Sequence, residues 1–137
     1  MRRKLIEQVI DKACLLVSYS AAYTADATGN SIDRDGYLSA RIACQCVGDT
    51  GADTQEFTFY VYDSSDNSTF AVHDSANATD SIAVGVATGI ETAGFDVDLA
   101  GAKRYIKVYA TVTGATTVTA FLTASCILGD AIEEPAT

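Results

Sequence analysis

The chain has 137 residues, of which 48% are hydrophobic and 20% are charged, so we expect one domain with a substantial core. Its formal net charge is −9, and an acidic body repels phosphate backbones, which argues against nucleic-acid binding. No stretch approaches the length of a membrane span, so we expect no membrane partner.

The amino-terminal segment has the spacing of an amphipathic helix over residues 3–17. Three basic residues, Arg2, Arg3 and Lys4, precede its apolar stripe. The stripe consists of Leu5, Ile6, Val9, Ile10, Ala13 and Leu16. We expect residues 1–18 to form a helix or arm that packs either on its own sheet or on a neighbouring subunit. Polar residues at 7, 8, 11 and 12 interrupt the apolar run, so a signal peptide is not expected.

Residues 19–130 have the alternating pattern of β-strands. An edge strand is expected around residues 19–25, and a longer strand over residues 38–47. The inward side chains of the longer strand would be Leu38, Ala40, Ile42, Cys44 and Cys46. Residues 56–63 predict an aromatic strand with Phe57, Phe59 and Val61 on one face. A turn at residues 63–68 would join it to residues 69–72 as a hairpin.

Two shorter strands are expected at residues 81–88 and 95–99, followed by a long hairpin over residues 103–128. A Gly114-Ala115-Thr116-Thr117 turn would join the two strands of this hairpin. The first strand would bury Ile106, Val108, Ala110 and Val112, and the second Ala120, Leu122, Ala124, Cys126 and Leu128. The other face of the second strand carries little polarity, which indicates that this strand is covered on both sides.

These elements predict an all-β fold, an antiparallel β-sandwich or jelly-roll with one N-terminal amphipathic helix. We divide the chain into an arm (1–18), a β-sandwich domain (19–130) and an acidic tail (131–137).

The potential reactive groups do not form a catalytic motif. His73 and Asp74 could belong to a Ser-His-Asp arrangement, but no nucleophile motif accompanies them, so an exposed histidine at a strand end is expected. The carboxylate pairs Asp33/Asp35 and Asp96/Asp98 are two residues apart and share a face, so we interpret them as solvated. We therefore predict no enzyme, no catalytic residue and no cofactor.

Potential metal ligands occur at two places. Asp63-x-x-Asp66-Asn67 is the best calcium candidate, but it lacks the EF-hand pattern, and an Asx-rich turn is favoured. Cys14, Cys44, Cys46 and Cys126 do not have zinc-site spacing. We expect reduced core thiols, with a Cys44–Cys126 or Cys46–Cys126 bridge as the alternative. No metal is predicted.

Three short motifs resemble small tailed-bacteriophage virion proteins of the head module. They are D-R-D-G-Y-L-S-A at residues 33–40, D-S-S-D-N-S within residues 57–70, and K-R-Y-I-K-V at residues 103–108. The third leads through residues 113–117 to Leu128-Gly129, and the resemblance covers most of residues 20–130.

This resemblance implies a decoration, or cement, protein bound outside an icosahedral capsid, made in the bacterial host cytoplasm. The implied partners are the major capsid protein and further copies of the chain, with a trimer favoured. Under this hypothesis the contact residues are Arg2, Arg3, Lys4, Leu5, Ile6, Val9 and Ile10.

Two other classes stay open. A head–tail connector or tail component would use the same β-domain in a ring. A carbohydrate-binding sandwich would use Tyr60, Tyr62, Tyr105 and Tyr109 as a sugar platform, whereas the simpler interpretation is that these tyrosines cover a sheet face.

Overall fold

The computed structural model describes residues 10–13, 27–48, 55–73, 79–84, 90–114 and 120–131. These ranges form ten β-strands and no helix, so they include no helix that could cross a bilayer. The strands are β1 (Ile10–Ala13), β2 (Ala27–Thr28), β3 (Ile32–Asp33), β4 (Tyr37–Gly48), β5 (Gln55–Ser64), β6 (Ala71–Val72), β7 (Thr79–Val84), β8 (Ile90–Asp98), β9 (Tyr105–Gly114) and β10 (Ala120–Ala131).

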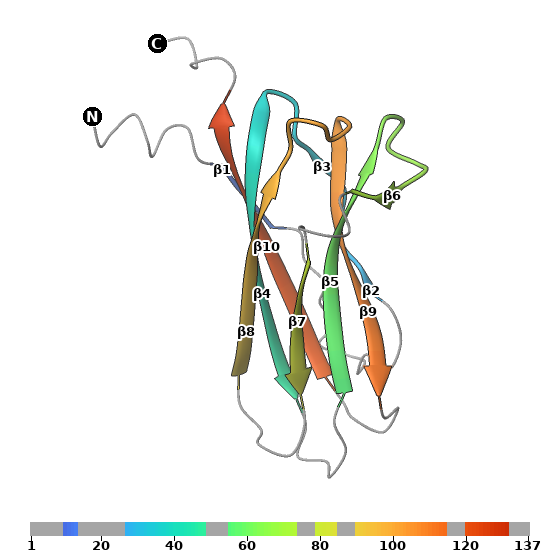
Figure 1. Cartoon of the computed structure of the whole chain (residues 1–137), viewed down its shortest axis with the longest axis vertical. Coiled ribbons are helices and arrows are strands. Elements are labelled where there is room, and N and C mark those ends of the chain that lie inside the picture. The colour runs from blue at the N-terminus through green and yellow to red at the C-terminus, as the bar shows by residue number, and fades with distance from the viewer. Residues whose placement is uncertain are drawn as a thin grey trace, which may run out of the picture.

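The strands form two sheets that face each other (Figure 1). Sheet A has four strands in the order β1-β10-β4-β8, and sheet B has six, with β5 and β9 at its centre. In sheet B, β2 and β3 pair with β9, whereas β6 and β7 pair with β5. All of these pairings are antiparallel, so the predicted β-sandwich is confirmed for the described ranges.

The core lies between the two sheets, and every second residue of each long strand contributes its side chain to it. The side chains that are large and almost fully enclosed are Phe57, Phe59, Ile42, Leu99, Ile106, Leu122, Leu128, Val61 and Val108. The predicted inward faces of β5, β9 and β10 are therefore confirmed at these positions. Leu38 is an exception with 39% exposure, because it lies near the end of β4, at the margin of the core.

The predicted hairpin over residues 103–128 is wrong in its pairing, although its two strands exist. β9 pairs with β5 in sheet B, with Val61 opposite Val108, whereas β10 pairs with β4 in sheet A, with Leu128 opposite Ala40. The chain therefore changes sheets between β9 and β10, as it also does from β4 to β5 and from β8 to β9. Alternation specifies which side of a strand is buried but does not identify its neighbour.

The predicted helix over residues 3–17 is wrong at residues 10–13, which form β1. This strand pairs with β10 in the register Ile10↔Leu128 to Ala13↔Ser125. The edge of β10 offers backbone donors and acceptors, and pairing with them outweighs a weak local helix preference. The rest of the predicted helix, the predicted strand at 19–25 and Cys14 lie outside the described residues.

The described cysteines are core thiols, so the alternative of a bridge between them is wrong. Cys44, Cys46 and Cys126 are reduced and buried, and all three belong to sheet A. Burial raises the pKa of the Cys46 thiol to about 12, because the thiolate would lose its hydration there. Cys46 is therefore neutral at physiological pH and acts as a small hydrophobic side chain.

Candidate functional site

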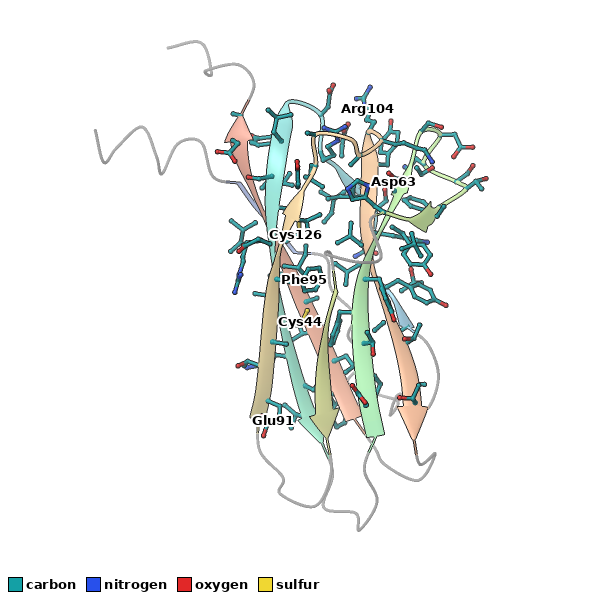
Figure 2. The ribbon with its side chains drawn as sticks, viewed as in Figure 1. Cys44, Asp63, Glu91, Phe95, Arg104 and Cys126 are labelled. Atoms are coloured by element: carbon teal, nitrogen blue, oxygen red, sulfur yellow. The ribbon has the colours of Figure 1, made fainter. Side chains whose placement is uncertain are left out.

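One end of the sandwich holds a polar cluster around Asp63, the penultimate residue of β5 (Figure 2). The Asp63 side chain is only 9% exposed, and its carboxylate contacts Lys103 Nζ at 3.2 Å and His73 Nδ1 at 3.2 Å. The backbone N–H of Lys103 also donates to Asp63 Oδ2 at 3.2 Å. These partners satisfy a carboxylate that would otherwise be costly to enclose.

His73 connects sheet B to sheet A, which corrects the prediction of an exposed histidine. Its side chain is 12% exposed, and its Nε2 lies 2.9 Å from the carbonyl oxygen of Asp98 at the end of β8. Its two ring nitrogens thus face an oxygen of each sheet, the Asp63 carboxylate in sheet B and the Asp98 carbonyl in sheet A. Asp63 is its carboxylate partner, and neither ring nitrogen is directed toward a hydroxyl nucleophile. Asp74 lies outside the described residues.

Arg34 fixes the connection between β8 and β9 beside this cluster. Its Nε donates to the carbonyl of Lys103 at 3.0 Å, its Nη1 to that of Tyr37 at 3.0 Å, and its Nη2 to that of Ala102. The turn that carries Arg34 needs Gly36, whose φ of +84° fits the third position of a type II turn. The guanidinium thus connects the turn before β4 to the turn before β9.

Asp33 and Arg104 form a two-pronged ion pair at the same end. Arg104 Nη2 lies 2.8 Å and Nε 3.1 Å from Asp33 Oδ2. These hydrogen bonds, together with the charge of Asp33, hold the pKa of Arg104 above its ordinary value. The sequence predicts a solvated Asp33; its side chain is 44% exposed, but this ion pair engages it.

The calcium candidate is an Asx-type turn, as favoured from the sequence. Asp66 Oδ1 accepts hydrogen bonds from the N–H of Thr69 at 2.9 Å, the N–H of Ser68 at 3.0 Å and the hydroxyl of Ser64 at 2.7 Å. These donors, that of Thr69 first, lower the pKa of Asp66. Asp63 is turned toward His73 instead, and no potential metal-binding group of three His, Cys, Asp or Glu occurs among the described residues.

The outer face of sheet B carries most of the described tyrosines. The rings of Tyr62 and Tyr109 stack at 4.8 Å between centroids, with 29° between their planes. Lys107 Nζ lies 4.2 Å from the centroid of Phe70. The two stacked rings use their faces on each other, so they cover the sheet rather than present an open platform for a sugar ring.

The outer face of sheet A is smoother, and we call it the flat face. It consists of the odd-numbered residues 39–47 of β4, the even-numbered residues 92–98 of β8 and the odd-numbered residues 121–129 of β10, whereas Tyr37 at the start of β4 packs against the core. A Cβ on Gly94 would lie 3.0 Å from Arg41 Nη2, and one on Gly129 would lie 3.0 Å from Ser39 Oγ. Two polar side chains thus lie over glycines, and Arg41 also pairs with Asp96 at 3.0 Å.

The predicted contact residues are placed only at Ile10, since residues 2–6 and 9 lie outside the described ranges. Asp96 is exposed as predicted, although it pairs with Arg41. Asp98 is exposed, and its Oδ1 accepts the N–H of Ala100 at 2.8 Å. Sequence reasoning missed the Asp63–His73 contact and both arginine contacts, because their partners are 10 to 71 residues apart. The D-x-x-G-Y and K-R-Y motifs were the available signal.

A scan against protein-family models and a search of curated proteins both return no match for this chain. The fold, however, occurs in many solved structures: 549 chains match. The PBSX exported protein XepA superposes with a TM-score of 0.52 and 16% identity, over 93% of this chain and 39% of that one. A chain of the T13 particle of infectious bursal disease virus superposes at 0.54 with 11% identity, over 89% of this chain and 31% of that one.

A carbohydrate-binding protein has the same fold. The CBM22-1 xylan-binding domain of Paenibacillus barcinonensis Xyn10C superposes at 0.52 with 13% identity, over 90% of this chain and 86% of that one. The chain spans less than half of XepA and of the virus protein. At these identities the likeness establishes a β-sandwich shared by an exported protein, a virus particle and a carbohydrate-binding module, and it selects none of their functions.

Proposed function

We propose that the chain is a structural, non-enzymatic virion protein that decorates and stabilises a phage head from the outside of the capsid. The observation that carries the proposal is that the three motifs of the phage resemblance meet at one end of the sandwich. Asp33 and Arg34 of the first motif bind Arg104 and the carbonyl of Lys103 in the third. Asp63 of the second motif binds Lys103 as well.

These contacts give the three motifs a shared structural role in this chain. Each motif supplies one side of a polar junction that joins three turns, so the motifs specify a structural corner rather than a reactive centre. Fold likeness to a chain of an icosahedral virus particle is compatible with this use of the sandwich. A junction of this kind, which holds three turns together, fits a protein that binds partners through its surface.

Stabilisation of the shell would follow from mass action. A protein that binds the expanded shell and not its dissociated subunits stabilises the shell. When the free concentration of that protein is 100 times its dissociation constant, the stabilisation is about 2.7 kcal/mol per site. In this proposal the shell contact is made by the predicted basic and apolar residues Arg2, Arg3, Lys4, Leu5, Ile6, Val9 and Ile10. Ile10 lies in β1, an edge strand of sheet A.

Co-sedimentation of the purified protein with empty, expanded capsids tests the proposal. We expect saturable binding that is lost in Arg2→Gln/Arg3→Gln/Lys4→Gln. The control Thr28→Glu/Thr69→Glu/Thr113→Glu makes the same charge change at exposed positions and should still bind. Absence of binding to the shell, with occupancy at a tail vertex instead, would replace decoration by a connector or tail role.

The carbohydrate-binding alternative is favoured by the fold of the xylan-binding domain but opposed by the Tyr62–Tyr109 stack. Binding of the isolated protein on a glycan array, lost in Tyr60→Ala, would support that alternative. We expect no such binding.

A further inference from the structure

The flat face carries charges of both signs. Its charged side chains are Arg41, Asp96 and Asp98, with a net charge of −1. Two copies of a protein whose net charge is −9 repel each other, so contact between copies is favoured where basic and acidic side chains can face each other. The flat face meets this condition at Arg41 and Asp96.

The flat face also exposes large apolar side chains at one level. Val47 and Phe121, which are 39% and 37% exposed, are register partners on β4 and β10. Two of the four large hydrophobic residues recorded as exposed in the described ranges thus lie side by side here. Together they form a small apolar patch that a partner could cover.

We propose that the flat face binds the flat face of a second copy of this chain. The two copies would be related by a two-fold axis that runs parallel to the strands, midway between β4 and β8. This axis places β4 of one copy opposite β8 of the other, so that each residue faces the other copy's version of its own register partner. Arg41 of one copy would then lie over Asp96 of its partner, and Asp96 over Arg41. Ala43 would lie opposite Gly94 in the same way, beside the Arg41 guanidinium that covers Gly94.

Charge and shape together favour a second copy as the occupant. Arg41 and Asp96 are 49% and 80% exposed, so each retains surface for a partner beyond their mutual contact. An Arg–Asp pair on adjacent strands is complementary to its own two-fold image, a property that a single charge would lack. The outer positions of β10, whose polarity is low, would border this contact and place Phe121 beside the edge strand of the second copy.

The expected contact is small. Two strands in full and the bordering side chains of a third, with strands about 4.8 Å apart and a rise of about 3.3 Å per residue, give a footprint on the order of 15 Å by 30 Å on each copy. The total buried area is then about 1,000 Å², the lower end for specific interfaces. We expect weak self-association, with a dissociation constant of about 10 to 100 µM.

Sedimentation equilibrium of the full chain without capsids tests this inference, which goes beyond the proposed function because it needs no shell. Wild type should shift from monomer to dimer between about 5 µM and 1 mM. Ala43→Glu places a charge at the centre of the flat face and should stay monomeric. Thr113→Glu, an exposed position in sheet B with the same charge change, should behave as wild type, and thermal melts verify that both variants fold.

A charge-reversal pair separates contact between copies from the ion pair within one copy. Arg41→Asp and Asp96→Arg should each weaken self-association about 10-fold, because like charges then face each other. An equimolar mixture of the two variants should restore it, because the two acidic side chains of one variant then face the two basic side chains of the other.

Two outcomes would overturn the inference. One is a wild-type protein that stays monomeric to about 1 mM, and the other is unchanged self-association in Ala43→Glu. If the wild type is monomeric and Ala43→Glu also abolishes capsid co-sedimentation, the flat face contacts the shell instead. Capsid binding by wild type can succeed or fail independently of self-association, so the test distinguishes this inference from the proposed function.

Discussion

The outer faces of the two sheets are built differently on similar alternating strands. On sheet A, the side chains of Arg41 and Ser39 lie over glycines of neighbouring strands. On sheet B, tyrosines stack on each other and Lys107 lies against the ring of Phe70. Sheet B satisfies its exposed aromatic surface within the molecule, whereas sheet A leaves a level surface that carries charges of both signs. The contrast indicates which face is suited to meet another sheet, because sheets pack when side chains interdigitate without tall obstacles.

The largest expected effect distinguishes a buried side chain from one on the outer face of sheet B, and two adjacent residues of β5 provide the comparison. Phe59→Ala removes a fully buried ring and should lower the free energy of unfolding by about 3–5 kcal/mol. Tyr60→Ala truncates a neighbouring ring on the outer face of sheet B and should cost much less. Urea unfolding measures both, and an equal loss for Tyr60→Ala would show that the outer face of sheet B is as enclosed as the core.

The junction between the sheets should be the next most sensitive feature. Asp63→Ala leaves His73 and the Lys103 amide without their acceptor and should cost about 2–3 kcal/mol. Asp96→Ala on the flat face is the control, because an exposed ion pair contributes little. Equal thermal shifts for the two variants would mean that the polar cluster does not hold the sheets together.

A methyl group added to the flat face probes its close contacts. In Gly94→Ala the new Cβ would lie 3.0 Å from the Ile42 carbonyl oxygen and 3.0 Å from Arg41 Nη2, so we expect a loss of about 1–2 kcal/mol. Gly101→Ala meets nothing within 4 Å and should be close to neutral. If calorimetry finds both substitutions harmless, Arg41 does not lie over Gly94.

The tyrosine stack of sheet B should give a measurable coupling. In a double-mutant cycle, Tyr62→Ala and Tyr109→Ala should show an interaction free energy of about 0.5–1.5 kcal/mol. Tyr60→Ala with Tyr105→Ala should be additive, since the register partner of Tyr60 is Tyr109. Additivity in the first cycle would show that the rings of Tyr62 and Tyr109 do not stabilise each other.

The smallest effect is expected at the turn between β5 and β6, and it depends on pH. The pKa of Asp66 lies below its ordinary value of 3.8, so its contribution to stability is present above that pH and is lost as the pH falls through the folded-state value. Asp66→Asn removes this dependence. The stability difference between wild type and the variant should therefore shrink from about pH 5 to about pH 2 in urea unfolding. A difference that grows on acidification would contradict the hydrogen bonding seen here.

Local chemistry was sufficient to predict the individual strands and several turns. The inward faces of β5 and β9 followed from residues alternating with period two, and the Asx-type turn at Asp66 from the run of small polar residues. The helix predicted at residues 3–17 is wrong at residues 10–13. The spacing of apolar residues in a short segment does not show whether the edge of a distant strand is available for pairing.

The sequence by itself determined which side of β5, β9 and β10 is buried, the Asx-type turn at Asp66 and the acidic character of the body. Only the tertiary structure decided that β9 and β10 belong to different sheets, that His73 connects Asp63 to the end of β8, and that Arg41 lies over Gly94. Each of these depends on contacts between residues distant in the chain. A period of two records the side on which a residue lies, but it holds no information about the strand that lies beside it.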